Sequence, residues 1–352
     1  MNDFSTGFTL QLFHLSDQEA NTSSVELAPN LSAVYNALSA EDIDGDGEAG
    51  YANTVFLSSG DAWIPGLFYE ASGEIYGADG AADVLIQNEL GIQAIAFGNH
   101  EFDNGTGIIA TLLTGEVEVE DGETFEPFGG ANYPYLSGNL DFTADENLGP
   151  LVTDDGQDAS TIPGQIAAST VVVTESGERI GVVGATTPTV GGISSPGNDI
   201  VISPDDFSNS SDEDIAALAA EIQADVDALL EANPDIDKVI LLSHMQVISI
   251  EFQLAELLEG VDIIMAGGSN SVLLDENDVP FADDTAFAQY PSFFTGADGN
   301  PVAVVNTDAA YQYLGRLVID FDDNGVIIPE SYDPDLSGAF ATDDAGVERV
   351  GA

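Results

Sequence analysis

Short apolar runs recur along the chain, and each one is followed by polar or charged residues. Their length of four to seven residues and their β-branched and aromatic content are typical of buried strands. The pattern therefore predicts strands over residues 9–15, 54–58, 94–97, 238–243 and 261–266.

Segments with helical periodicity lie between these strands. Residues 28–39 and 81–90 are predicted helices. The clearest helix follows Ser211, a predicted N-cap with three acidic residues after it, and ends before Pro234. Residues 175–178 predict a hairpin turn. Helices between successive strands favour parallel crossovers, so we predict an α/β fold of two sheets covered by helices.

The predicted strands end in side chains that bind metals and transfer protons. An isolated Asn-His pair often only caps a helix, but here such groups repeat at several strand ends. Because the carboxyl ends of parallel strands meet at one edge of a sheet, the pattern predicts a shared site there. The groups are Asp17 and Glu19, Gly60-Asp61, Gly98-Asn99-His100-Glu101-Phe102-Asp103, His244, and Gly267-Gly268-Ser269-Asn270.

The order of these groups resembles the calcineurin-like metallophosphoesterases, and within them the 5'-nucleotidase and alkaline-phosphatase-like branch. The resemblance extends from Thr9 to about Pro329 and includes Tyr313-Leu314-Gly315-Arg316-Leu317 near its end. It implies a four-layer α/β/β/α sandwich of two mixed sheets flanked by helices. The metal site would lie at the carboxyl ends of the strands.

In that family two metal ions lie side by side, and the resemblance implies a role for each matching residue. Asp17 would bind the first ion, Asp61 would bridge both ions, and Asn99 and His244 would bind the second. His100 would stabilise the phosphate charge or protonate the leaving oxygen. The implied reaction is hydrolysis of a phosphomonoester by a metal-bound hydroxide, as in an alkaline phosphatase or 5'-nucleotidase.

The chain departs from the family at three positions. Glu19 stands where the family usually has histidine, and Gly268 and Asn270 replace the two histidines of the last motif. The first ion would then have only oxygen ligands, from Asp17, Glu19, Asp61 and Asn270. Such a set favours hard cations such as Ca²⁺, Mg²⁺ or Mn²⁺ over Zn²⁺ or Fe. At the second ion, Ser269, a backbone carbonyl or water would fill the gap at Gly268.

Two interpretations of these replacements stay open. The chain could be an active phosphoesterase with altered metal preference, or a degenerate module that binds metal or a surface partner. Random decay would also have eroded the other motif residues, and those are present, so we favour the enzyme.

Charge sets the chain apart from most soluble domains. It has 63 Asp and Glu against 4 Lys and Arg, a formal net charge of -59. Self-repulsion of this size needs salt to screen it, so we expect an extracellular or periplasmic protein of a marine or halophilic bacterium. So few basic residues cannot form a nucleic-acid track, which ranks a nuclease or phosphodiesterase below a phosphatase acting on small esters.

Composition also bears on compartment and domains. The chain has no cysteine and no apolar stretch long enough for a membrane span. Residues 1–7 lack the features of a signal peptide, so either the signal was removed or export uses a different one. We assign residues 1–335 to the catalytic domain, and 336–352 to a tail or linker toward a C-terminal substrate-binding domain absent from this chain.

Four further residue groups carry secondary hypotheses. Asp42, Asp44 and Asp46 resemble the first half of an EF-hand loop, so this segment is either an additional Ca²⁺ site or an acidic insertion. Trp63 either lines the mouth of the substrate pocket or packs beneath it. Asn139 is a candidate for orienting His100 or substrate. His14 we expect in the core.

Overall fold

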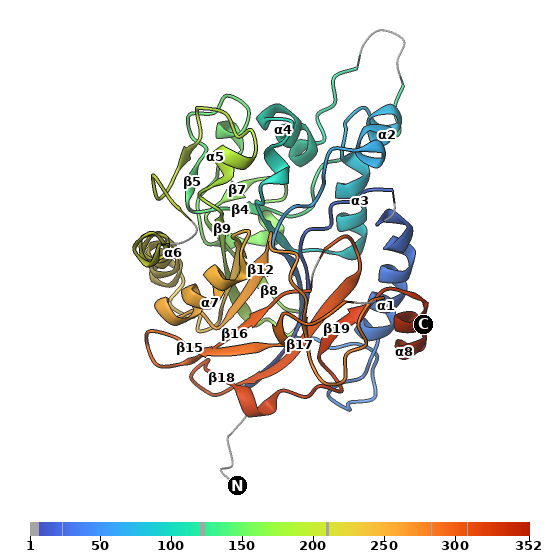
Figure 1. Ribbon diagram of the computed structural model, residues 1–352, viewed down its shortest axis with the longest axis vertical. Helices are drawn as coiled ribbons and strands as arrows, with labels where there is room; N and C mark the ends of the chain where they lie inside the picture. The colour runs from blue at the N-terminus through green and yellow to red at the C-terminus, as the bar shows by residue number, and fades with distance from the viewer. Residues whose placement is uncertain (1–6, 23, 120–123, 209–210, 283, 308) are drawn as a thin grey trace.

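The computed structural model describes residues 7–22, 24–119, 124–208, 211–282, 284–307 and 309–352. Two large mixed sheets lie in the middle of the molecule, and helices cover their outer faces (Figure 1). The predicted α/β architecture of two mixed sheets flanked by helices is therefore confirmed.

The first sheet contains eight strands in the order β18-β17-β1-β2-β3-β4-β7, with β19 also paired to β17. Strands β1 to β4 and β7 run parallel, whereas β17 is antiparallel to β1. The strands are β1 (Phe8–Leu15), β2 (Thr54–Ser58), β3 (Ala94–Ala96), β4 (Tyr135–Leu136), β7 (Ile166–Ala167), β17 (Tyr313–Phe321), β18 (Ile327–Ile328) and β19 (Gly338–Ala341).

The second sheet contains seven strands in the order β15-β16-β12-β11-β9-β8-β6. Its central strands β9, β11, β12 and β16 are parallel, and β8 joins β9 in the predicted hairpin. The strands are β6 (Gln157–Asp158), β8 (Ser169–Val173), β9 (Arg179–Thr186), β11 (Val239–His244), β12 (Ile263–Gly267), β15 (Ser292–Thr295) and β16 (Pro301–Val305).

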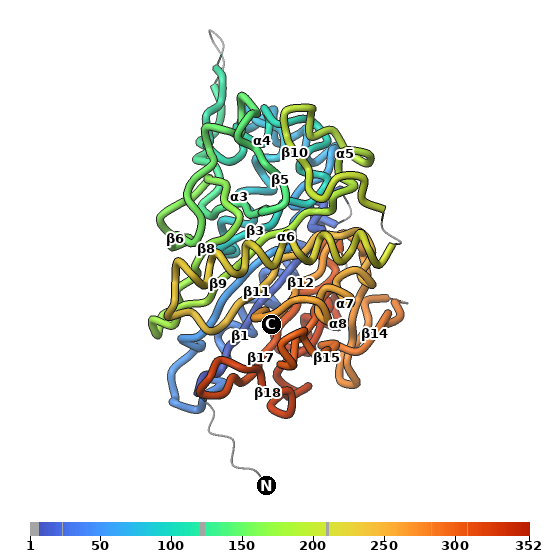
Figure 2. The backbone as a smooth tube through the Cα atoms, turned by 90° about the vertical axis from the view of Figure 1, so that its left-hand side faces the viewer, coloured from blue at the N-terminus to red at the C-terminus, as the bar shows by residue number. Residues whose placement is uncertain are grey.

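Helices α1 to α4 cover the first sheet, and α6 and α7 cover the second. Figure 2 shows α6 stretched over β8 and β9. The α-helices are α1 (Ala28–Ser39), α2 (Leu67–Tyr76), α3 (Ala81–Leu90), α4 (Thr106–Thr114), α5 (Val190–Ile193), α6 (Asp212–Ala232), α7 (Ile248–Leu257) and α8 (Asp344–Val350).

Smaller elements occupy the connections. Two two-stranded sheets pair β5 (Leu140–Asp141) with β10 (Val201–Ile202) and β13 (Leu273–Leu274) with β14 (Ala288–Gln289). The short 3-10 helices are η1 (Val25–Leu27), η2 (His100–Phe102), η3 (Gly149–Leu151), η4 (Ala159–Thr161) and η5 (Pro329–Ser331).

Alternation along β1 explains why a buried strand reads as a continuous apolar run. Leu10 and Leu12 face the core between the two sheets, whereas Phe13 and Leu15 face the core under the helices. Successive side chains of a strand point to opposite faces, so a strand covered on both sides is apolar at nearly every position. The polar residues that follow such a run therefore mark the point where the chain leaves the core.

The C-terminal segment corrects one expectation. Residues 336–352, which we expected as a tail or linker, contribute β19 to the first sheet and α8, which packs against α1. The four-residue strand Gly338–Ala341 is too short to show a period of its own, and its pairing with β17 decides its structure. This segment is part of the folded domain.

Residues 1–6, on which the signal-peptide interpretation mainly rests, lie outside the described residues. Among the described residues, no helix combines the length and apolar composition needed to span a membrane.

Candidate metal centre

The loops that follow β1, β2, β3, β11 and β12 converge at one edge of the paired sheets. The Asp17 N–H donates to the Gly60 carbonyl at 2.9 Å, which joins the loops after β1 and β2. His244 Nδ1 lies 2.8 Å from the Ser59 carbonyl and ties the second sheet to the first. The Gly268 N–H, after β12, donates to both Asp17 oxygens at 3.0 and 2.9 Å.

Two overlapping clusters of ligand-type side chains occupy this edge. Side-chain ligand atoms of Asp17, Asp61 and His244 lie within 4.8 Å of one another, and so do those of Glu19, Asp61 and His100. Asp61 belongs to both clusters. The structure thus places Asp61 between two groups of donors, as a bridging ligand requires.

Asn99 completes the group on the side of His244. His244 Nε2 lies 3.0 Å from Asp61 Oδ2 and 3.3 Å from Asn99 Oδ1. Asp61, Asn99 and His244 are all at most 5% exposed. The structure therefore brings together Asp17, Glu19, Asp61, Asn99, His100 and His244, although their roles as ligands stay predictions.

The backbone at this edge adopts conformations that side-chain-bearing residues usually avoid. Asp17, Glu19 and Asp61 have φ of 49°, 40° and 52°, in the left-handed region. Such strain persists where the surroundings enforce it, and it is concentrated at functional sites. Gly98 has a steric reason to be glycine, because a Cβ there would lie 2.2 Å from Asp61 Oδ1.

Glu101 holds two of these loops in place. Its fully buried carboxylate accepts hydrogen bonds from the N–H groups of Asp61 at 3.1 Å, Ala62 at 2.7 Å and Gly98 at 2.7 Å. Burial, reinforced by the charge of Asp61, raises the pKa of Glu101 to about 8. Sequence reasoning assigned no role to Glu101, although its place beside Asn99 and His100 in the motif was a signal.

His100 is oriented by Asp103, a second residue to which sequence reasoning assigned no role. His100 Nδ1 lies 2.6 Å from Asp103 Oδ2, while its Nε2 lies 3.4 Å from Glu19 Oε1. Ser194 donates to the other Asp103 oxygen at 2.7 Å. Burial lowers the pKa of His100, but the charges of Asp61, Asp103 and Glu19 outweigh it and raise the pKa overall. The protonated imidazole is thereby favoured over the neutral one.

The carboxylates repel one another in a buried setting. Burial, with the charge of Asp61, raises the pKa of Asp17 to about 6 against the attraction of His244. Burial and repulsion from Asp17 raise the pKa of Glu19 to about 7. At Asp61 burial acts the same way, but the adjacent His244 outweighs it and lowers the pKa. Burial opposes charge on His244, yet Asp61 raises its pKa to about 10.

These residues fit divalent cations. The ionised forms of Asp17 and Glu19, which burial and repulsion among the carboxylates disfavour, gain from a nearby positive charge. Carboxylate oxygens of Asp17, Glu19 and Asp61 are the majority of the clustered ligand atoms, whereas His244 and the Asn99 amide add an imidazole nitrogen and an amide oxygen. Hard cations suit the first set, and the second accepts a wider range.

The remaining candidate residues have different surroundings. Asn270 ends the loop after β12 with an exposed side chain and a φ of 47°, and its role as a ligand stays a prediction. Trp63 lies in the core, 1% exposed and packed on Tyr135. His14 is buried, 2.7 Å from the Tyr290 hydroxyl, as expected of a core histidine.

Asn139 corrects the expectation that it orients His100 or substrate. Its side-chain N–H groups donate to the carbonyls of Thr186 at 2.8 Å and Ser203 at 2.9 Å. Its Oδ1 accepts from the Thr186 N–H at 2.8 Å. These backbone contacts occupy the amide, which serves to join two segments of the fold.

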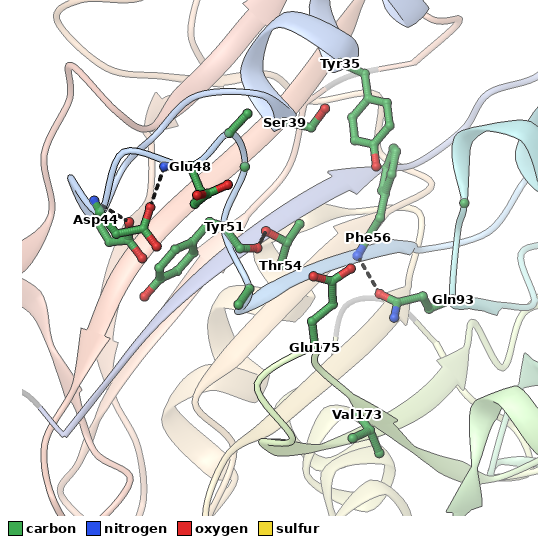
Figure 3. Close-up of a pocket in the computed structure, with 15 residues that line it drawn as sticks. Tyr35, Ser39, Asp44, Glu48, Tyr51, Thr54, Phe56, Gln93, Val173 and Glu175 are labelled. Carbon is green, nitrogen blue, oxygen red and sulfur yellow. Dashed lines mark hydrogen bonds between the residues drawn. The ribbon is translucent and has the colours of Figure 1, made fainter.

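The loop with Asp42, Asp44 and Asp46 lies at the amino end of β2, away from the centre just described. Oxygens of its three exposed carboxylates lie within 4.8 Å of one another. Asp42 also accepts N–H bonds from Gly45 at 2.8 Å and Gly47 at 3.0 Å. Beside this loop is a cavity of about 500 Å³ (Figure 3). Acidic side chains line it, including Glu48 and Glu175, so it suits a cation better than a phosphate ester.

Comparison with known proteins identifies the family. No protein-family model matches the chain. It is 31% identical over 297 residues to mouse 5'-nucleotidase, a match covering 84% of this chain and 42% of that protein. The chain thus spans less than half of that relative.

Solved structures agree on the fold. The 5'-nucleotidase precursor from Thermus thermophilus aligns with a TM-score of 0.67 and 24% identity over 97% of this chain and 57% of that one. The calcineurin-like phosphoesterase YfkN from Bacillus subtilis aligns with a TM-score of 0.56 and 13% identity over 97% and 95%. With its sequence relatives and its fold, this chain belongs to the calcineurin-like metallophosphoesterases, as a metallophosphoesterase domain of the 5'-nucleotidase family.

Proposed function

We propose that this domain hydrolyses phosphomonoesters, in the manner of a 5'-nucleotidase or alkaline phosphatase, with two divalent cations. The observation that carries the proposal is the pair of clusters that share Asp61, one of which includes His100. The relationship to 5'-nucleotidases supports this reaction class. The relatives are longer than this chain, and the proposal concerns the phosphoesterase domain alone.

Each cation has a distinct set of residues. Following the family resemblance, Asp17, Glu19 and Asp61, with Asn270, would hold the first, and Asp61, Asn99 and His244 would hold the second. Asp17 and Glu19 lie in different clusters, but each has a carboxylate oxygen within 4.8 Å of Asp61. Paired cations neutralise the phosphate and lower the pKa of a bound water into the neutral range. The oxygen-rich first set leads us to propose Ca²⁺, Mg²⁺ or Mn²⁺ rather than Zn²⁺ or Fe.

The protein's own groups orient the substrate and supply a proton. Asp103 accepts from Nδ1 of His100 and so fixes the imidazole with Nε2 toward the carboxylates. The raised pKa of His100 favours its protonated form, which would protonate the leaving oxygen. The backbone N–H of His100 donates to Asp61 Oδ1 at 2.7 Å and so holds the Asp61 carboxylate in place.

The charge of the chain argues for small substrates. A net charge of -59 with 4 basic residues repels polynucleotides, whereas a small ester meets positive charge at the cations. We propose that the protein works in a salty extracellular or periplasmic setting, where screening reduces this repulsion. We also propose Ca²⁺ for the loop of Asp42, Asp44 and Asp46.

Phosphate release from AMP and from an aryl phosphate tests the function. His100→Asn should lower kcat by about 100-fold or more, because the proton donor is lost. The exposed Asp235→Asn is the control and should leave the rate unchanged. A module that only binds would release no phosphate in any form, and a nuclease would cleave polynucleotide faster than the aryl phosphate. Either result would reject the proposal.

A further inference from the structure

The gap left by Gly268 is already filled by another side chain. A Cβ on Gly268 would lie 2.6 Å from Gln246 Nε2 and 2.7 Å from His244 Nε2. An imidazole at position 268, as the family pattern has it, would therefore need the space that the Gln246 amide occupies. The Gln246 side chain can occupy this space because residue 268 has no side chain.

Gln246 reaches this space from the loop after β11. It lies two residues beyond His244, half-buried, with a φ of 67°. This left-handed conformation is uncommon for a side-chain-bearing residue, and four proposed ligands on other loops share it. The strained turn brings the Gln246 amide back beside the imidazole that precedes it.

The amide end of Gln246 lies among the donors of the second cluster. Its Nε2 donates to Asn99 Oδ1 and lies 3.1 Å from His244 Nε2. His244 Nε2 is in turn 3.3 Å from Asn99 Oδ1 and 3.0 Å from Asp61 Oδ2. Atoms that bind one ion at about 2.0–2.3 Å lie roughly 3 Å from one another. The spacing is that of neighbouring corners of one coordination shell.

We propose that Gln246 is a ligand of the second cation and replaces the family histidine missing at position 268. Rotation of its amide by half a turn puts Oε1 where Nε2 now lies, so the oxygen faces the ion. The ligands of this ion would then be Asp61, Asn99, His244 and Gln246. The inference rests on the proposed function, because it assumes a second cation.

A purely structural role is the competing explanation. In that case the Gln246 N–H groups would only hold Asn99 and His244 in place. The two roles need opposite chemistry, since a ligand needs an oxygen and a structural donor needs an N–H. A glutamate at position 246 keeps the oxygen and removes the donor, so it separates them.

Titration of metal-free protein with Mn²⁺, followed by calorimetry, tests the proposal without an activity assay. About 1 M salt suppresses loose binding to the acidic surface. An Asp42→Asn/Asp44→Asn background removes the acidic loop as a site. Gln246→Ala should weaken one of two Mn²⁺ sites about 10-fold or more, whereas Gln246→Glu should bind at least as tightly as the parent. Gln253→Ala, at a half-buried position in α7, is the control.

The outcomes separate the two proposals. Two Mn²⁺ sites of unchanged affinity in Gln246→Ala, or a site as weak in Gln246→Glu as in Gln246→Ala, would overturn the ligand role and leave the proposed function standing. A parent protein that fails to bind two ions would reject the proposed function itself.

Discussion

At the scale of single residues, the buried carboxylate of Glu101 supports the candidate metal centre although it is not a proposed ligand. Glu101 accepts three N–H bonds and so positions the loops that carry Asp61 and Asn99. Glu101→Ala leaves three buried donors without an acceptor and should lower the free energy of unfolding by about 3 kcal/mol or more. Chemical denaturation in EDTA measures this free energy, and the exposed Glu256→Ala is the control. A loss below about 1 kcal/mol would contradict this role.

Asp83 is a second buried carboxylate, with a different expected effect. Among the described residues neither of its oxygens has a hydrogen-bond partner, and burial raises its pKa well above the usual range. The folded state then binds more protons than the unfolded state above about pH 4, so this group lowers stability as pH rises toward its folded pKa.

Asp83→Asn should therefore stabilise the protein at neutral and higher pH. The amide has nearly the same shape and cannot ionise, so the free energy of unfolding at pH 8 should rise by on the order of 1 kcal/mol. Near pH 4 the variant and the parent should agree. An equal difference at both pH values would show that ionisation of Asp83 is not the cause.

At the scale of elements, we propose that the acidic loop before β2 binds Ca²⁺, because oxygens of its three carboxylates lie within 4.8 Å of one another. Binding of Ca²⁺ at the loop should raise the melting temperature of the parent protein by about 2 °C for each kcal/mol that it adds to the free energy of unfolding. Asp42→Asn/Asp44→Asn should lose that increase, because it removes two charges from the cluster. The exposed Asp333→Asn is the control. An undiminished Ca²⁺ effect in the loop variant would assign it to another site.

Helices whose bounds follow from their own periodicity and capping residues were predictable from the sequence. The bounds of α1 and α3 agree with the predicted 28–39 and 81–90, and Ser211 caps α6 by accepting from the Asp214 N–H. The helix α7 was not predicted, because Ile248 and Ile250 at its start are β-branched and disfavour a helix locally. Their burial against the second sheet decides the structure instead.

In the candidate site, too, some residues were predictable from local sequence and others depend on contacts between distant loops. Strand-end motifs indicated Asp17, Asp61, Asn99 and His244, because each lies within four residues of the end of an apolar run. Gln246 has no such signal, since its side chain meets Asn99 only after loops 147 positions apart in the chain are folded together. Contacts between distant loops are the part of the site that sequence pattern cannot supply.

At the scale of the whole molecule, the charge of -59 should make stability depend strongly on salt. The Debye length falls from about 10 Å at 0.1 M to about 3 Å at 1 M, which weakens repulsion among the surface carboxylates. The melting temperature should rise by several degrees over this range, equally in NaCl and KCl, because screening is not ion-specific. A melting temperature independent of salt would contradict self-repulsion as the dominant surface effect.

The central claim is that the residues around Asp61 hold a pair of cations that hydrolyse phosphate esters. Phosphate release from AMP, followed while Mn²⁺ is added to metal-free protein at about 1 M salt, measures it most directly. We expect no release without a divalent ion, a rise as both sites fill, and none with Asp61→Asn at any ion concentration. Release that persists in EDTA, or a parent protein inactive with Ca²⁺, Mg²⁺, Mn²⁺ and Zn²⁺ alike, would contradict the claim.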